Sequence, residues 1–278
     1  CVYMGGVALN CVANSIIARD HYPNLWILPN PGDAGSSLGS AAYVFGEHIN
    51  WTSPFTGYEI KGRYPNKKVL DELLKGNIVG VANGRAEFGP RALGNRSLLA
   101  DPRGHEIKDR VNEIKHRQKF RPFAPSVLEE YAHEIFDMPV KKSQFMQFVA
   151  NCKFPDKYPA ICHVDGSSRV QTVSKDNNLR FRKLLDSFYE KTNCPVLLNT
   201  SFNIKGQPIE NITETLDKSG YVSSVISTSE VTHATPAAFV VHTSSRYLTD
   251  EISIQMTDSK IKNILGGGRK FFMTEEDG

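Results

Sequence analysis

The sequence predicts an α/β fold in which buried strands alternate with amphipathic helices. Short apolar runs bounded by glycine or proline, at residues 78–82 and 195–198, are typical of buried strands. Apolar residues at helical spacing occur at Phe181, Leu184, Leu185 and Phe188. A chain of 278 residues that is 40% apolar can form packed cores in one to three domains. We therefore expect a mixed, twisted sheet with flanking helices in the middle of the chain.

The composition excludes some classes of function and sets the expected environment. A net charge of +3 is too small to indicate nucleic-acid binding, and no apolar run approaches the ~20 residues of a membrane span. The five cysteines are scattered without zinc-type spacing, which predicts free thiols in a reducing, cytoplasmic compartment. We expect no membrane partner, and the composition does not indicate an oligomeric state.

The first region, residues 1–62, begins with a short strand at 2–4 that is followed by Gly5 and Gly6. Paired glycines between a strand and a helix either let the backbone approach an anion or simply form a tight turn. Because the chain starts at Cys1, directly before this loop, we expect a fragment whose beginning is missing.

A second glycine-containing loop, at residues 30–35, precedes a helix of small residues that we expect over 36–47. Asp33 lies at the head of that helix, where an acidic side chain serves either as a cap or as a contact for metal or phosphate. The small side chains of the helix favour close packing against a neighbour.

The second region, residues 65–210, begins with a short helix expected over 69–75 and a strand after it. The loop 84–97 that follows is rich in glycine and arginine and includes Arg91 and Arg96. Arginine captures carboxylate or phosphate groups through two parallel hydrogen bonds. The loop is therefore either an oxyanion site or a solvated turn.

A dense cationic stretch spans residues 103–121, with seven lysines and arginines and three acids. Apolar residues at helical spacing predict a short helix over 107–114, which ends at Lys115 and Arg117. These cations suit a phosphate or acyl-phosphate ligand. The helix dipole also favours cations at a helix C-terminus, which is a purely structural reason for them.

The prolines of residues 121–125 predict an extended segment, and a helix is expected after it. Ser126 and Glu129 fit a capping box, and the apolar pattern continues to Ile135. We therefore predict a helix over residues 126–135.

Two further polar segments lie at 162–173 and after the strand at 195–198. The first contains His163, which is either a structural or a catalytic histidine; no hydrolase triad or zincin motif accompanies it. The second carries Asn199, Ser201 and Asn203 at the end of a strand, a common place for a ligand.

Together these motifs resemble the carbamoyltransferase family that includes nodulation-factor and antibiotic O-carbamoyltransferases. The matching strings are GGVALN, PGDAGSSLGSA, EFGPRALGNRSLLADP, KHRQKFRPFAPSV, HVDGSSRVQTV and PVLLNTSFNIKGQPI. The resemblance implies the remnant of an actin/sugar-kinase-like transferase domain over 1–62 and a YrdC-like domain over 65–210. It also implies synthesis of a carbamoyl-adenylate from carbamoyl phosphate and ATP, followed by transfer to a hydroxyl of a small-molecule, nucleoside or sugar acceptor.

The resemblance assigns roles to individual residues. The KxR…SxN signature of YrdC-like proteins implies catalytic roles for Lys115, Arg117, Ser201 and Asn203. Further substrate-binding candidates are Arg91, Arg96, Arg121, His163, Arg169 and Asn199. The nucleotide-binding loop of the family corresponds to Gly5, Gly6 and Asn10. Such arginines and lysines would neutralise the oxyanions of two phosphate-bearing substrates.

The family also binds a divalent metal, iron or magnesium, and its metal-binding aspartate corresponds to Asp33. The two metal-binding histidines of the family come from an HxxxH motif, and this sequence contains none. We therefore predict that the transferase half-site is incomplete and that this chain does not transfer the carbamoyl group to an acceptor.

Residues 211–278 resemble an internal part of alkaline phosphatase instead, in the strings GYVSSVISTSEVTHATPAAFVVHTSSR and IKNILGGGRKFF. This resemblance implies a short βαβ-like tail, with Thr235 from a magnesium site and Arg246 from a phosphate site. The nucleophile and the zinc-binding motifs have no counterpart, so we predict that two incomplete regions are joined near residue 211. A phosphomonoesterase fragment and an RNA-binding YrdC-like module are the alternative functions.

Overall fold

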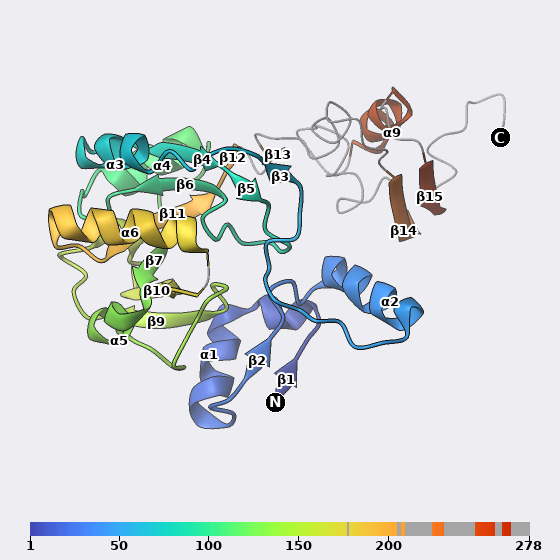
Figure 1. The fold of residues 1–278 in the computed structure, drawn as a ribbon, viewed down its shortest axis with the longest axis horizontal. Coiled ribbons are helices and arrows are strands. Elements are labelled where there is room, and N and C mark those ends of the chain that lie inside the picture. The colour runs from blue at the N-terminus through green and yellow to red at the C-terminus, as the bar shows by residue number, and fades with distance from the viewer. Residues whose placement is uncertain (177, 205–206, 209–223, 231–247, 259–262, 268–278) are drawn as a thin grey trace. The chain divides into compact units, whose positions relative to one another are not determined.

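The computed structural model describes residues 1–176, 178–204, 207–208, 224–230, 248–258 and 263–267 (Figure 1). The chain divides into two compact units, Cys1–Phe202 and Asn203–Gly278. The predicted first region, 1–62, and most of the predicted second region therefore belong to one compact unit.

The centre of the first unit is a seven-stranded mixed sheet. Its strands, from one edge to the other, are β4 (Val79–Ala82), β6 (Arg96–Ala100), β11 (Val196–Ser201), β7 (Ala124–Leu128), β10 (Ser167–Val173), β9 (Phe148–Cys152) and β8 (Phe136–Asp137). Strands β7 and β10 run parallel, and the other neighbours run antiparallel. The expectation of a mixed α/β fold with strands near 78–82 and 195–198 is confirmed. The actin-like and YrdC-like descriptions remain predictions.

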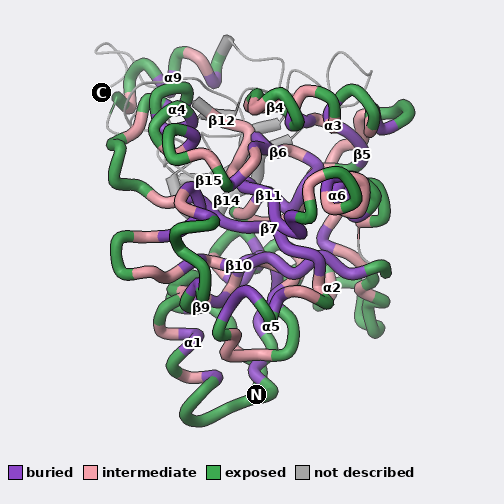
Figure 2. The backbone as a smooth tube through the Cα atoms, turned by 90° about the vertical axis from the view of Figure 1, so that its left-hand side faces the viewer, coloured by how far each residue is buried: buried purple, intermediate pink, exposed green. Residues whose placement is uncertain are grey.

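The core lies along the middle strands of this sheet, where Figure 2 shows continuous burial over β6, β11, β7 and β10. Val196, Leu197 and Leu198 of β11 are completely buried, as a run of consecutive apolar residues requires when both faces of a strand are covered. The polar residues that follow them on β11 are thereby held at the end of a rigid strand.

The longer helices that follow the N-terminal region in the first unit are α3 (Asn66–Leu74), α4 (Ile107–Ile114) and α6 (Leu179–Thr192). Helix α6 packs on β7, β11 and α3. The apolar stripe predicted on α6 is completely buried, at Phe181, Leu184, Leu185 and Phe188. The periodicity therefore predicted both the helix and its buried face.

The helix predicted over residues 126–135 is wrong in its first half. Residues Ala124–Leu128 form strand β7, all of them buried, and a 3₁₀ turn η3 (Glu129–Tyr131) and a short helix α5 (Ala132–Ile135) follow. Ser126 lies between β10 and β11 and pairs with Gln171 on one side and Leu197 on the other. Two strand ladders and burial outweigh a local capping pattern.

The N-terminal elements are β1 (Val2–Tyr3), η1 (Gly6–Leu9), α1 (Cys11–Asp20), β2 (Trp26–Ile27), η2 (Asp33–Gly35) and α2 (Ser36–Phe45). Strands β1 and β2 pair in parallel. Helix α1 packs on β9: the Ser15 hydroxyl accepts from the Val149 N–H at 2.8 Å, and the Asn14 amide donates to the Gln147 carbonyl at 3.0 Å. These side-chain bonds attach the first region to the edge of the sheet.

The close packing predicted for the small-residue helix is not observed. Helix α2 has no buried residue, and Tyr43 and Val44 are 89% and 86% exposed. Its main neighbour in the described structure is the adjacent turn η2. Small side chains permit close packing but do not supply the apolar area that drives it.

Short strands complete the fold. Strand β3 (Glu59–Ile60) pairs antiparallel with β5 (Gly84–Arg85), and η4 (Pro159–Ile161) precedes β10. In the second unit, β12 (Asn203–Ile204) pairs antiparallel with β13 (Gln207–Pro208), and β14 (Ser224–Glu230) pairs parallel with β15 (Asn263–Gly267).

Helix α9 (Thr249–Asp258) lies between β14 and β15 in sequence, as the predicted βαβ-like tail requires. Thr235 and Arg246 lie outside the described residues. Within the described part of the chain, no helix is both long and apolar enough to cross a membrane.

Candidate anion-binding site

Helix α4 ends in a tight turn that places Lys115 and Arg117 at its C-terminus. His116 adopts a left-handed backbone with φ 49°. Its N–H donates to the Glu113 carbonyl at 3.0 Å, and the Arg117 N–H donates to the Asn112 carbonyl at 2.9 Å. This is the Schellman pattern, with histidine where glycine is most common. The backbone therefore fixes the directions in which the two cations leave the helix.

The loop after this turn is held against the helix by Asn112, which is completely buried. Its amide donates to the carbonyls of Lys119, at 3.2 Å, and Arg121, at 3.0 Å. Asn112 was not among the residues predicted from the sequence. The signal that could have identified it is an asparagine on the apolar face of an amphipathic helix.

Lys115 reaches the end of β11, where its Nζ donates to the Ser201 carbonyl at 2.5 Å and lies 3.5 Å from the Ser201 hydroxyl. The fold thus joins two predicted catalytic residues that are 86 positions apart. Burial, and next the charge of Arg117, lowers the pKa of Lys115 to about 7. An anion bound beside this amine would favour its charged form and raise that pKa.

Four arginines, Arg91, Arg117, Arg121 and Arg169, form what we call the arginine cluster. Burial, and next the charge of Arg91, lowers the pKa of Arg169 to about 10, and Arg117 contributes further. Burial and then the charge of Arg121 lower the pKa of Arg117. Each of the four guanidinium groups is therefore close enough to at least one other to be repelled by it.

The arginine cluster has no carboxylate partner in the described structure, where the salt bridges involve other residues. The Nε of Arg169 is buried and has no hydrogen-bond partner there. Arg91, Arg117 and Arg169 are half-buried and Arg121 is exposed, and charges that are partly withdrawn from water are usually compensated because desolvation is costly. An arrangement of neighbouring cations without acids is therefore suited to a multivalent anion such as a phosphate.

His163 lies beside the arginine cluster. Burial lowers its pKa, Asp165 opposes this change, and the charges of Lys108 and Arg169 lower the pKa further. The His163 N–H donates to the Ser167 carbonyl at 2.9 Å, within the turn that leads into β10. Both the structural and the catalytic interpretation of this histidine are compatible with that position.

The loop that carries Arg91 is organised by Glu87, the acid that the sequence places among its arginines. One Glu87 carboxylate oxygen accepts from the N–H groups of Leu93, at 2.7 Å, Asn95, at 2.9 Å, and Arg96, at 3.3 Å. Gly94 has φ 117°, and a Cβ atom there would lie 2.5 Å from the Phe181 ring. Glycine is required at this position, and the carboxylate folds the loop around it.

Arg96 has a different environment from the arginine cluster. Its guanidinium donates to the backbone carbonyls of Asn83, Gly84, Asn95 and Tyr58, at 3.3, 3.2, 2.9 and 3.2 Å. It therefore ties the loop to neighbouring backbone segments. The predicted role of Arg96 as an anion ligand stays a prediction.

Asn199 is completely buried in a polar network that crosses three strands of the sheet. Its amide donates to the Ser126 hydroxyl at 3.0 Å, to Gln171 Oε1 at 3.1 Å and to the Ala92 carbonyl at 3.1 Å. Gln171 in turn donates to the Leu93 carbonyl at 3.1 Å. The network supports the loop beside Arg91 from within the sheet, so Asn199 holds this loop in place.

The predicted nucleotide loop lies at the start of α1. Gly5 has φ 100°, and its N–H donates to the Pro31 carbonyl at 2.8 Å. Nothing lies within 4 Å of a Cβ atom placed on Gly6, so the surface there is open. Asn10 caps α1 by accepting from the Ala13 N–H at 3.1 Å. The side chain of Cys11 hydrogen-bonds to Arg169, which connects this part of the chain to the arginine cluster.

The described residues do not fit a metal site at Asp33. This residue is exposed in η2 and makes no side-chain capping bond. Within the described ranges, no three His, Cys, Asp or Glu side chains lie close enough together to hold an ion. Asn203 lies in the second unit, where it pairs with Pro208.

The fold and the site define an α/β protein with a cluster of neighbouring cations at one end of its central sheet strands. Two family models match the chain: the carbamoyltransferase N-terminus over residues 1–42 and the carbamoyltransferase C-terminus over residues 70–233. The chain belongs to the carbamoyltransferase family, as the sequence motifs predicted. The C-terminal match extends beyond the boundary predicted near residue 211.

Curated relatives agree with this assignment. The chain is 38% identical over 260 residues to an uncharacterised protein of Synechocystis sp., 37% identical over 237 residues to the nodulation protein NolO of Bradyrhizobium diazoefficiens, and 35% identical over 229 residues to the 3′-hydroxymethylcephem-O-carbamoyltransferase of Amycolatopsis lactamdurans. Each match covers 74% of this chain and 42–43% of the relative. The chain thus spans less than half the length of these relatives.

A solved alkaline phosphatase from the Antarctic bacterium TAB5 is 31% identical to this chain and covers 27% of it and 22% of the phosphatase, with a TM-score of 0.25. A score this low supports no inference about fold or activity. The predicted phosphatase-like tail therefore stays a prediction.

Proposed function

We propose that this chain carries the part of a carbamoyltransferase that binds carbamoyl phosphate and ATP and forms a carbamoyl-adenylate. The observation that supports this most directly is the arginine cluster, four neighbouring guanidinium groups without an acidic partner in the described structure. Both substrates are polyanions, and the reaction places their phosphates side by side. Membership of the carbamoyltransferase family supports a carbamoyl-group donor as one of the substrates.

The proposed chemistry has two steps. Hydrolysis of carbamoyl phosphate gives carbamate and phosphate. A carbamate oxygen then attacks the α-phosphorus of ATP, a new C–O–P linkage forms, and the bond to the bridging oxygen breaks as pyrophosphate leaves. Charge accumulates on phosphoryl oxygens during the attack, so cations fixed before the reaction lower its barrier. In this proposal Lys115, held at the end of β11, donates to one of these oxygens, and Arg117 and Arg169 donate to others.

Transfer of the carbamoyl group to a hydroxyl is proposed for the whole protein. The relative from Amycolatopsis lactamdurans is named as an O-carbamoyltransferase of a hydroxymethylcephem, which has a hydroxyl acceptor. We propose a small molecule, nucleoside or sugar hydroxyl as the acceptor in this case too. Divalent iron or magnesium would assist that step in the whole protein. The sequence predicts that this chain alone does not complete the transfer, and the proposal keeps that prediction.

The test is pyrophosphate release from ATP by the purified chain, with and without carbamoyl phosphate. We expect release that requires carbamoyl phosphate and falls at least about 100-fold in Lys115→Ala, because a preorganised donor to a developing oxyanion contributes about that much. Ser201→Ala should reduce the rate less, since the main bond of Lys115 at this strand end is to the Ser201 backbone carbonyl.

A matched control is Lys119→Ala. Lys119 belongs to the same cationic stretch, but its amine lies 3.8 Å from Asp109 and 3.5 Å from Glu113, on the exposed side of α4. This variant should retain the rate. Release that is independent of carbamoyl phosphate, equal losses in Lys119→Ala and Lys115→Ala, or no release by the folded chain would each contradict the proposal.

A further inference from the structure

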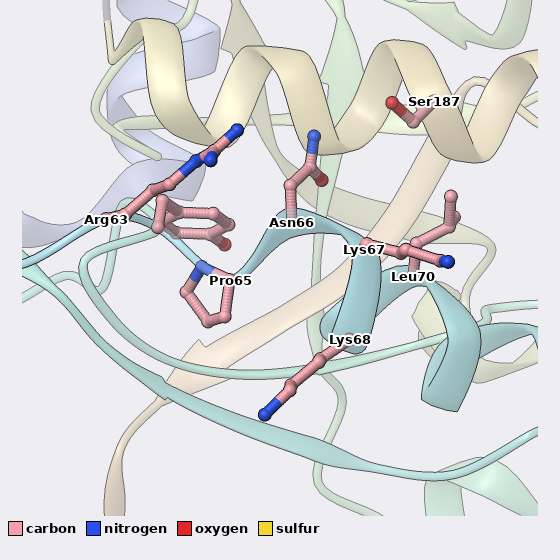
Figure 3. A pocket seen from close by; sticks show the side chains of 8 residues that line it. Arg63, Pro65, Asn66, Lys67, Lys68, Leu70 and Ser187 are labelled. Carbon is pink, nitrogen blue, oxygen red and sulfur yellow. The ribbon is translucent and has the colours of Figure 1, made fainter.

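A second candidate site lies at the beginning of α3, and its lining shares no residue with the arginine cluster. A cavity of about 570 Å³ is found there (Figure 3). Its lining includes Arg63, Tyr64, Asn66, Lys67, Leu70 and Ser187. This volume falls within the ~300–1,000 Å³ that is common for small-molecule sites. Arg63 and Asn66 extend from the start of α3 toward α6, which carries Ser187 (Figure 3).

The N-terminus of α3 is open to a ligand. No side chain caps the helix; the Asn66 N–H donates to the Tyr64 carbonyl at 2.9 Å, and the next N–H to bond back is that of Val69, to the Pro65 carbonyl at 3.0 Å. The backbone N–H groups of Lys67 and Lys68 precede that bond, in the first turn. A helix N-terminus with free N–H groups and its dipole favours an anion.

Tyr64 supplies an independent observation. This residue lines the cavity and is only 9% exposed, yet its hydroxyl is buried without a hydrogen-bond partner in the described structure. Burial raises the pKa of Tyr64 well above its ordinary value, so the hydroxyl remains a donor. A buried hydroxyl without a partner costs free energy, and a ligand oxygen in the cavity would remove that cost.

A second buried atom at the same place also lacks a partner. The Oδ1 atom of Asn66 is buried and accepts no hydrogen bond within the described residues. An amide oxygen requires a donor such as a hydroxyl or an amine. The cavity therefore offers donors for an anion and an acceptor for a hydroxyl or amino group.

Three exposed cations surround the opening: Arg63, Lys67 and Lys68. None of them forms a salt bridge in the part of the chain that the structure describes. Leu70 and Pro65 add apolar surface. Residues 63–68 lie between the two family-model matches, which end at 42 and begin at 70.

We propose that this α3 cavity binds a phosphate monoester of a small organic molecule. Its phosphate would lie at the N-terminus of α3, beside the free backbone N–H groups of the first turn and Arg63, with Lys67 adding positive charge at the cavity wall. The Tyr64 hydroxyl would donate to a ligand oxygen, and Asn66 Oδ1 would accept from a hydroxyl or amino group of the organic part. The proposal is independent of the carbamoyl chemistry.

The experiment is isothermal titration calorimetry of the full chain with AMP, glucose 6-phosphate and inorganic phosphate. To exclude binding at the arginine cluster, the titrations are made in the Lys115→Ala background as well as in the parent. We expect at least one of the two monoesters to bind more tightly than inorganic phosphate, equally in both backgrounds. Preference for AMP or for glucose 6-phosphate identifies the organic group.

Two variants test the site. Arg63→Glu combined with Lys67→Glu should weaken binding at least about tenfold, the equivalent of one lost charge-assisted hydrogen bond. Tyr64→Phe keeps the ring and removes only the hydroxyl, and it should weaken binding by about fivefold. Lys141→Glu, a charge reversal of an exposed lysine in another loop, should leave binding unchanged.

Circular dichroism confirms that each variant is folded. Absence of monoester binding in the parent chain overturns the proposal. So does binding that is unaffected by both sets of variants, or binding that disappears in Lys115→Ala, since it would then belong to the arginine cluster.

Discussion

Arg182 is buried and Arg169 is half-buried, and the protein surrounds their two guanidinium groups differently. Arg182 is 3% exposed, and its guanidinium donates to Glu130, Asp186 and the Val173 carbonyl. Burial alone would lower the pKa of Arg182, but the hydrogen bonds to Glu130 and Asp186 raise it above its ordinary value. Arg169 has other arginines around it, and its pKa is lowered to about 10.

The two arginines differ in whether neighbouring acidic groups compensate their charge. The hydrogen bonds to Glu130, Asp186 and the Val173 carbonyl offset the free energy of desolvating Arg182. This residue therefore stabilises the junction of α6 and the sheet. At Arg169 the described residues do not offset the desolvation free energy of the guanidinium group, because the neighbouring charges have the same sign. Such an arrangement is what the proposed function requires, in which a bound phosphate supplies the missing negative charge.

The largest expected effect is on stability, in Arg182→Ala. This change leaves two carboxylates without their partner and removes a buried side chain. We expect the free energy of unfolding to fall by about 2–3 kcal/mol, below the range for fully buried pairs because Glu130 and Asp186 are partly exposed. Urea denaturation measures it. A loss below about 1 kcal/mol would contradict the interpretation of Arg182 as a structural residue.

The second prediction concerns Arg169→Ala, which should behave in the opposite way. The free energy of unfolding should change by less than about 1 kcal/mol, because lost packing is offset by relief of repulsion from Arg91 and Arg117. ATP affinity should fall at least about tenfold, as expected for one lost charge-assisted hydrogen bond. Denaturation and calorimetry on the same preparation give both values. Destabilisation as large as in Arg182→Ala would remove the contrast between the two arginines.

The smallest expected effect is at His116, whose φ of 49° is unfavourable for a residue with a side chain. His116→Gly should raise the free energy of unfolding by about 0.5–1 kcal/mol, since glycine adopts this conformation without strain but gains freedom in the unfolded chain. His116→Val serves as the comparison and should destabilise. The melting temperature measures both. A destabilising glycine would show that the imidazole itself contributes contacts.

Much of the candidate site was predictable from local sequence. The spacing of apolar residues located α4 and hence the position of Lys115 and Arg117 at its end, and the apolar run before Asn199 located β11. These predictions succeed because helix and strand periods are encoded by neighbouring residues. The contact between Lys115 and Ser201 was implied by the family signature, not by spacing, because two segments 86 positions apart leave no joint local pattern.

Other features of the site could not be predicted from local sequence patterns. The Ser126 segment has the local pattern of a helix start but forms β7, because strands on both sides of it satisfy its backbone. Glu87 appeared as a lone acid among arginines, yet it folds the loop of Arg91 by accepting three backbone N–H groups. In the sequence, Arg91 and Arg96 were equivalent candidates for binding an anion. Only the fold shows that Arg91 belongs to the arginine cluster, whereas Arg96 donates to backbone carbonyls.

By itself the sequence determined the family, the α/β class, the principal helices and strands, and the residue types that suit phosphate chemistry. Those properties follow from short-range periodicity and from motifs within single segments. Only the tertiary structure decided which cations are compensated and which are left facing one another, and it alone revealed the α3 cavity with the buried Tyr64 hydroxyl. The physical reason is that burial and electrostatic partnership depend on residues distant in the chain, and these meet only when the sheet assembles.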